Sequence, residues 1–360
     1  EATSHALLAT CDAFVRGVPM DLYSDCHNKE MPSKSVSNIL VCIAHVMGDQ
    51  NVCNVFEVQS QAILDELVKC HSGTTTRYQL FDKYFRSVLH TLSISGAVDG
   101  DDSYRAIEAF DFLLRQSGGS TVAKNFDMIL PIFQSRTAED LRETSRGALK
   151  LMALLESTVS DSSFSILMQP LALALVDDVI GPSLVWKPGG KAAALRKISS
   201  AALFSLLRGK SVCATTLQKS APHLLPILKT NASDEDDGTR ELSLLSLGII
   251  FELVPLTLST KSMDITNWLD DSSEAVRIAA CGCLGHLLRA VPSEEFSGNF
   301  IDTIVEQLVI YLDDPSEPVA EACADLLREI TVRIDPLIVA TKRLEHHSSI
   351  SGRESPKAPH

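Results

Sequence analysis

The sequence has few aromatic residues and no uninterrupted apolar run long enough to span a bilayer. Aromatic residues make up 6% of the 360 positions and apolar residues 45%, so a core would consist mainly of medium-sized aliphatic side chains. The longest apolar candidate, residues 242–258, is interrupted by Glu252 and Pro255. These features favour helices packed on helices and argue against a membrane-spanning segment.

Basic charge is also scarce. The formal net charge is −14, which disfavours a general surface for nucleic acid or for anionic membranes. Nine cysteines are scattered without a framework of regular spacings, and their odd number suggests reduced thiols in a cytoplasmic protein. No stretch shows convincing period-two alternation, so we predict an all-α fold.

Residues 268–288 carry the pattern that organises the rest of the chain. They read as the end of one helix, a polar turn and a second helix with an apolar face at the 3.6-residue period. Residues 311–327 repeat this pattern 43 positions later. A helical pair recurring near that period predicts an α-solenoid of HEAT-type repeats, and we count about seven pairs.

The expected boundaries follow from the same pattern. We predict one solenoid over residues 1–345 and a disordered tail over residues 346–360, which lack an apolar pattern. We expect a break at residues 177–190, which contain proline and several glycines, and a helix end at Gly118-Gly119. The chain begins without methionine in helical sequence, so we expect it to be the C-terminal part of a longer protein.

A second repeat signal is an arginine near the start of successive second helices. Aspartates precede those helices, as in the pairs at residues 270–271 and 313–314, and Ser273 and Ser316 are the expected N-caps. Each arginine could reach an aspartate of a neighbouring turn and form a ladder, which is the interpretation we favour; binding of an anionic partner is the alternative. The arginines are Arg105, Arg142, Arg196, Arg240 and Arg277.

Motifs for catalysis are not recognisable. Gly189-Gly190-Lys191 resembles the end of a phosphate-binding loop, but Ala192 replaces the required hydroxyl residue. Cys42 and His45 could share a helix face, yet four zinc ligands with suitable spacing are not evident. Cys281 and Cys283 should point in different directions, and His286 reads as a packing or solvent-facing residue. We therefore expect no catalytic, cofactor-binding or metal-ligating residue, and a protein that is not an enzyme.

Trp186 is the one unusual residue, because a large aromatic stands in a segment rich in proline and glycine. It is either packed between repeats, which we favour, or presented to a partner, since tryptophan is a frequent interface anchor.

Several short motifs occur in an order that extends beyond a generic helical repeat: LVW at 184–186, GKAAALR at 190–196, WLDDS at 268–272, VRIAA at 276–280 and LDDP at 312–315. In these the chain resembles the C-terminal region of the dynein axonemal assembly factor 5 family, most clearly over residues 180–345. Residues 1–180 resemble that family only in their helical-pair architecture.

The resemblance implies a cytoplasmic, non-enzymatic scaffold that helps to preassemble the dynein arms of motile cilia. Implied partners are dynein intermediate chains, other assembly factors and chaperones, with no nucleic acid, membrane or cofactor. We expect the concave face, lined by the second helices of successive repeats, to hold the client. The alternative is a generic HEAT-repeat adaptor of the nuclear-transport or phosphatase-scaffold type.

Overall fold

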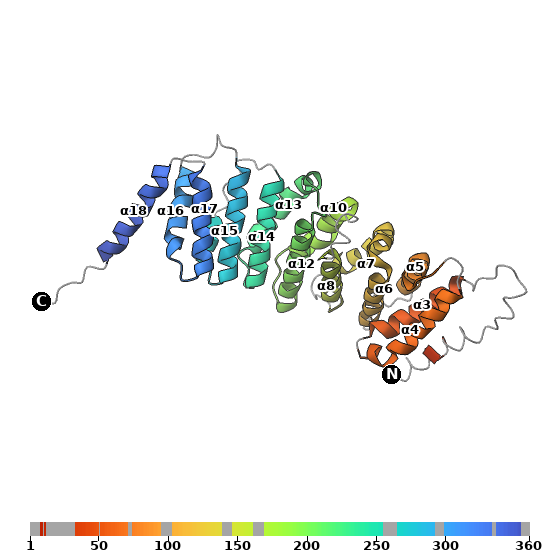
Figure 1. Cartoon of the computed structure of the whole chain (residues 1–360). Coiled ribbons are helices and arrows are strands. Elements are labelled where there is room, and N and C mark those ends of the chain that lie inside the picture. The colour runs from red at the N-terminus through yellow and green to blue at the C-terminus, as the bar shows by residue number, and fades with distance from the viewer. Residues whose placement is uncertain are drawn as a thin grey trace, which may run out of the picture. The chain divides into compact units, whose positions relative to one another are not determined.

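Every element that the computed structural model describes is helical (Figure 1). The described residues are 8, 9, 11, 33–49, 51–70, 74–94, 103–138, 146–160, 169–254, 265–291, 299–332 and 336–353. No strand occurs within these ranges, which confirms the all-α fold class. A search of the same ranges finds no helix that is both long and apolar enough to cross a membrane.

The chain divides into two compact units, Glu1–Leu171 and Ala172–His360, which we call the N-terminal and C-terminal units. Each is described by itself. The expectation that residues 1–345 form one continuous stack stays a prediction.

The N-terminal unit is a cluster of packed helices. Its core holds the aromatic side chains of the amphipathic helix α5, in which Phe81 and Phe85 are fully buried. A Cβ atom at Gly48 would come within 2.5 Å of the Glu108 backbone, so α3 and α6 approach closely at that point. The elements are α3 (Ser33–Gly48), α4 (Cys53–Lys69), α5 (Arg77–Ile94), α6 (Ser103–Lys124), α7 (Phe126–Ala138), α8 (Arg146–Ser160) and η1 (Gln169–Leu171).

The C-terminal unit consists of successive helical pairs. One row of neighbouring helices, α12, α14, α15 and α17, which we call the front row, packs each helix against the next (Figure 1). The preceding elements α13, η4 and α16 pack against α14, α15 and α17 respectively. The elements are α10 (Ala172–Ala174), η2 (Leu175–Ile180), α11 (Gly181–Leu184), α12 (Gly190–Arg208), α13 (Ala214–Asn231), α14 (Asp237–Leu253), η4 (Ile265–Asp270), α15 (Glu274–Ala290), α16 (Asn299–Ile310), η6 (Tyr311–Asp313), α17 (Glu317–Thr331) and α18 (Pro336–Arg353).

Two expected interruptions differ from the structure. Gly118 has the left-handed φ of 69° expected at a helix C-cap, but the helix resumes beyond it, so α6 is kinked rather than ended. The predicted break at 177–190 is wrong in its first half, because η2 is a π-helix and α11 continues to Leu184. Buried Val179 and Ile180 hold this segment in the core, and Pro182 lies in the first turn of α11, where its missing N–H costs little.

The end of the chain also differs from the expectation of a tail beginning at residue 346. Helix α18 continues to Arg353 and packs against α16 and α17. Val339 is buried, and His346 Nε2 lies 3.0 Å from Asp313 Oδ2, so contacts near the start and the middle of the helix attach it to the preceding repeat. Residues 354–360 lie outside the described residues.

Candidate protein-binding surface

Ion pairs link each turn of the C-terminal unit to the next. In each link an arginine at the start of a front-row helix binds an aspartate in the turn before the following front-row helix. The nitrogen–oxygen distances are 2.8, 2.8 and 3.0 Å. The three links are Arg196–Asp234, Arg240–Asp271 and Arg277–Asp314. The expected ladder is therefore present, and it occupies these arginines with structural contacts.

A repeated local geometry positions both partners. Each aspartate accepts a hydrogen bond from the backbone N–H two residues further on, at 2.8–3.0 Å. Each arginine also donates to a backbone carbonyl of the turn that precedes its own helix; Arg277, for example, donates to the Asp271 carbonyl at 2.8 Å. Ser273 and Ser316 do occupy the N-cap positions, but neither side chain makes a capping hydrogen bond. The aspartates accept instead from the backbone N–H groups of the two serines themselves, a contact that fixes the turn and does not cap the first helical N–H groups.

The electrostatics of the middle link favour the ionised pair. Burial alone would raise the pKa of Asp271, but hydrogen bonds from Arg240 and from the Ser273 N–H lower it by more. The hydrogen bond to Asp271 raises the pKa of Arg240. Asp271 therefore stays ionised and is poorly suited to proton transfer.

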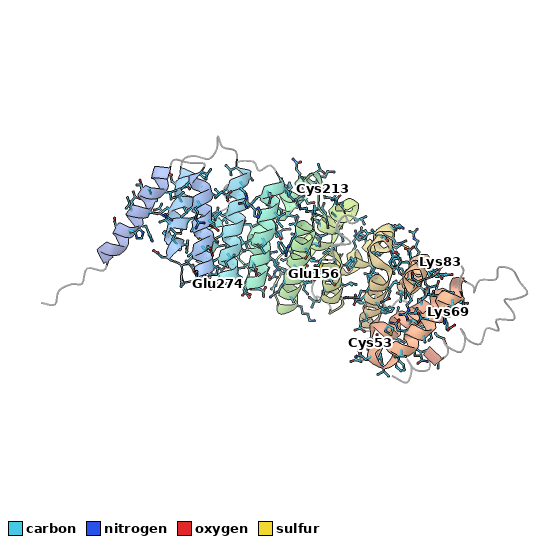
Figure 2. The ribbon with its side chains drawn as sticks, viewed as in Figure 1. Cys53, Lys69, Lys83, Glu156, Cys213 and Glu274 are labelled. Atoms are coloured by element: carbon cyan, nitrogen blue, oxygen red, sulfur yellow. The ribbon has the colours of Figure 1, made fainter. Side chains whose placement is uncertain are left out.

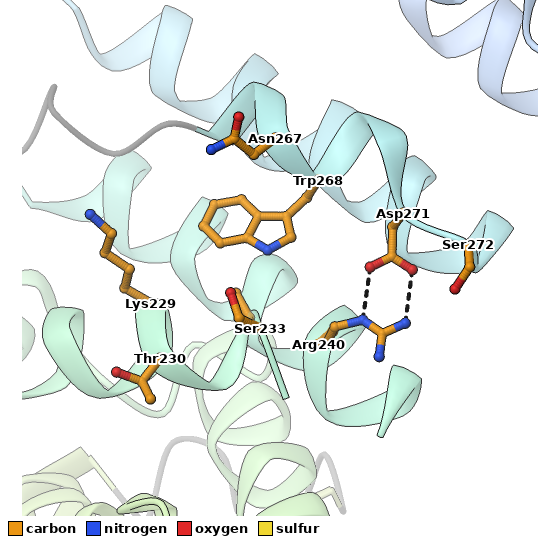
Figure 3. A pocket seen from close by; sticks show the side chains of 9 residues that line it. Lys229, Thr230, Ser233, Arg240, Asn267, Trp268, Asp271 and Ser272 are labelled. Carbon is orange, nitrogen blue, oxygen red and sulfur yellow. Dashed lines mark hydrogen bonds and ion pairs between the residues drawn. The ribbon is translucent and has the colours of Figure 1, made fainter. Parts of the chain in front are cut away.

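An open groove of about 960 Å³ lies beside this link (Figure 3). Its walls are the end of α13, which carries Lys229, and the short η4 segment, which carries Asn267 and Trp268. The donors of Arg240 are directed to Asp271 and to the carbonyls of Asp234 and Glu235. The groove therefore offers a ligand the Lys229 ammonium, the Asn267 amide, hydroxyl groups and an indole. These groups suit hydrogen bonding to a polypeptide.

The exposed charges of the last two front-row helices are mainly acidic. Glu274, Glu317 and Glu321 are exposed, and within the described residues they form no ion pair. Figure 2 labels Glu274 near the start of α15. Asp325 is also exposed but contacts Arg328. This part of the surface would attract a basic region of a partner.

The thiol and imidazole groups weighed from the sequence make contacts of other kinds where the structure describes them. Among the described residues, no group of three or more histidine, cysteine, aspartate or glutamate side chains could hold a metal ion. Cys42 instead hydrogen-bonds to Cys11, which lowers the pKa of Cys42 to about 7. Cys283 is fully buried, and burial raises its pKa. The Sγ atom of Cys281 lies 3.6 Å from that of Cys323 on α17, and His286 Nδ1 lies 2.8 Å from Glu252 Oε2.

Sequence reasoning did not single out Asp234, Lys229 or Asn267. Asp234 had a usable signal, because Asp234 and Asp271 each stand six residues before the arginine of their own repeat. No comparable pattern marks the groove, since it arises where η4 takes the place of a full helix beside α13. Arg105 has no described side chain and Arg142 lies outside the described residues.

A model of the HEAT repeat matches residues 264–291, which include the organising stretch at 268–288. Dynein axonemal assembly factor 5 from Mus musculus is 21% identical over 336 residues, covering 89% of this chain and 38% of that protein. The Homo sapiens protein of the same name is 22% identical over 321 residues, covering 86% and 36%. The chain is therefore similar to dynein axonemal assembly factor 5 over most of its own length.

The similarity to dynein axonemal assembly factor 5 is broader than the sequence motifs indicated. An alignment covering 89% of the chain must extend into the first 180 residues, where we had noted only a shared architecture. The chain spans a little over a third of the length of these relatives. Probable importin subunit beta-4 from Schizosaccharomyces pombe is also similar, with 25% identity over 204 residues, covering 53% of this chain and 19% of that protein.

Proposed function

We propose that the chain is part of a non-enzymatic scaffold for the preassembly of axonemal dynein arms in the cytoplasm. The observation that carries this proposal is the similarity to dynein axonemal assembly factor 5 over most of the chain. A stack of helical pairs suits the task, because such stacks offer extended surfaces to large protein clients. The partners proposed are dynein intermediate chains, other assembly factors and chaperones.

The front row of the C-terminal unit is the face that we assign to the client. The arginines of the front row already bind aspartates of the same unit, so the contacts between its repeats do not depend on the client. Its exposed Glu274, Glu317 and Glu321 would steer a basic surface of the client towards the row. Reversing these charges should therefore weaken capture chiefly by slowing association, with little effect on folding.

Affinity capture from the cytosol of ciliated cells tests this function. The bait is the full-length protein that contains this region. We expect it to recover dynein chains together with assembly factors. The variant Glu274→Lys/Glu317→Lys/Glu321→Lys should recover less of them. Its control replaces exposed acidic residues of the N-terminal unit, with Glu57→Lys as the first substitution.

The similarity to an importin subunit supports a second candidate, a nuclear-transport adaptor. The two proposals differ in what the bait recovers. Transport cargo or phosphatase subunits without any dynein chain would refute the assembly-factor proposal and favour the adaptor. Equal recovery by the front-row variant and its control would refute the assignment of the client to the front row.

A further inference from the structure

The segment between α11 and α12 exposes two large apolar side chains. Trp186 is 52% exposed and Val185 is 43% exposed. The sequence had favoured burial of Trp186 between repeats, and the structure shows the opposite. Exposed tryptophan is unfavourable in water unless something covers it, and tryptophan is among the side chains that contribute most to protein interfaces. We call residues 185–191, which include the first two residues of α12, the Trp186 loop.

Buried polar side chains fix the Trp186 loop in place. Arg196 donates to the Lys187 carbonyl at 2.7 Å, and Asn231 donates to the Leu184 carbonyl at 2.9 Å. The Arg196 guanidinium also lies 5.8 Å from the centre of the Trp186 ring. Pro188 further restricts the backbone conformation of Lys187. A partner would therefore meet an aromatic side chain on a backbone already held in position, which reduces the entropy lost on binding.

The charge of the loop differs in sign from that of the chain as a whole. Lys187 and Lys191 lie on either side of the two glycines, and within the described residues neither ammonium group forms an ion pair. Lys197, six residues beyond Lys191 on α12, shows the contrast, because its Nζ lies 3.0 Å from Asp236 Oδ2. Partial burial lowers the pKa of Lys187, so a carboxylate near its ammonium group would favour the charged form.

We propose that the Trp186 loop binds an acidic segment of a partner protein, with an apolar side chain of that segment lying against Trp186 and its carboxylates near Lys187 and Lys191. The proposal does not depend on the function in dynein assembly, because it can be tested with peptides alone. A single-stranded nucleic acid could also combine stacking with negative charge. The net charge of −14 disfavours it, so a peptide is the better match.

Selection from a random-peptide display library tests the proposal without assuming a sequence. We expect the whole chain to enrich peptides that are acidic and contain an aromatic or large aliphatic residue. Trp186→Ala should weaken their binding by at least about tenfold, as expected for an interface anchor. The matched control is Leu344→Ala, which removes another exposed apolar side chain of the same unit and should leave peptide binding unchanged.

Three further variants separate the effect of charge from an effect on folding. Lys187→Glu/Lys191→Glu should abolish binding of the selected peptides, whereas Lys197→Glu should change it much less. In Trp268→Phe, Trp186 is the only tryptophan, so its emission should shift to shorter wavelength when peptide binds. Unchanged fluorescence of Trp268 in Trp186→Ala shows that this variant is folded.

The proposal is overturned if the enriched peptides are basic, if no peptide is enriched, or if folded Trp186→Ala binds them as tightly as the unchanged chain does. It is also overturned if a single-stranded oligonucleotide binds the Trp186 loop more tightly than the selected peptides do.

Discussion

The Arg196 guanidinium lies 2.8 Å from the Asp234 carboxylate, and the two side chains are only 5% and 1% exposed. This pair joins α12 to the turn before α14 across 38 residues of chain. Removing one member of such a pair leaves a buried charge without compensation, so its loss costs far more than the net contribution of the intact pair. The neighbouring pair Lys197–Asp236 joins the same two elements at the surface, where Lys197 is 50% exposed.

The two neighbouring pairs predict different costs for two adjacent substitutions. Arg196→Ala should lower the free energy of unfolding of the C-terminal unit by about 3–5 kcal/mol. Lys197→Ala should lower it by less than about 1 kcal/mol, because solvent screens an exposed pair. Urea unfolding followed by tryptophan fluorescence measures both, since both tryptophans lie in this unit. Equal losses in the free energy of unfolding for the two variants would show that burial does not determine how much each pair stabilises the unit.

The Arg240–Asp271 link predicts a loss of stability in acid. The folded-state pKa of Asp271 is lowered, so its contribution is fully present above the unfolded pKa of about 4 and is lost as the pH falls through the lower folded value. Asp271→Asn should therefore be about 3 kcal/mol less stable at neutral pH. The difference should shrink as the pH falls below about 4 and through the lowered pKa of folded Asp271. Asp270→Asn is the control, because Asp270 is exposed and lies outside the ladder; an equal effect there would contradict the prediction.

Cys213 should be an unusually reactive thiol. Hydrogen bonds with the hydroxyls of Thr215 and Thr216, each at 3.1 Å, lower its pKa to about 7 at the start of α13 (Figure 2). About half of it is then thiolate at pH 7, and the thiolate is the reactive form. Cys70 is also an exposed residue, but partial burial of its sulfur atom and the negative charge of Glu66 raise the pKa of this thiol.

Mass spectrometry after brief alkylation at pH 7 should find Cys213 modified well before Cys70. Thr215→Val/Thr216→Val should slow modification of Cys213 and shift its rate to higher pH. If the double variant reacts as fast as the unchanged chain, the hydroxyl groups do not cause the reactivity.

Two helical glycines in adjacent front-row helices predict opposite effects of the same substitution. A Cβ atom at Gly248 would lie 2.9 Å from His286 Cδ2 and 3.2 Å from the Cys283 Cα atom, so α14 and α15 would have to separate. A Cβ atom at Gly282 would meet nothing within 4 Å. Gly248→Ala should destabilise the unit by about 1–3 kcal/mol, whereas Gly282→Ala should stabilise it by up to about 1 kcal/mol. Thermal unfolding would contradict this if both shifts had the same sign.

The parts of the structure that sequence predicted are those that recur. The apolar face of residues 268–288 and its copy at 311–327 predicted helices α15 and α17, with bounds close to those observed. The ladder was predictable for the same reason, since one arginine per repeat needs one acceptor per repeat.

The parts that sequence did not predict occur once and depend on contacts made elsewhere in the unit. The helical segment at 175–180 buries Val176, Val179 and Ile180, but Gly181 and Pro182 directly after it made the sequence read as a break. Serines and glycine in α18 suggested a tail, yet packing of Val339 and the contact between His346 and Asp313 favour a helix. Exposure of Trp186 depends on Arg196 and Asn231, which hold its loop from outside the local sequence.

The three described links of the ladder have the same orientation, since each of these arginines binds an aspartate of the repeat that follows. Arg277 binds Asp314, and Ala320 occupies the position where that last repeat would carry an arginine of its own. Excising one full period, such as residues 235–271, would remove one arginine of the ladder together with one aspartate of the ladder. Arg277 would still be followed by Asp314. A lineage could therefore lengthen or shorten this stack by whole periods while its interior stays electrically balanced, and only insertions of partial periods would leave a charge unmatched.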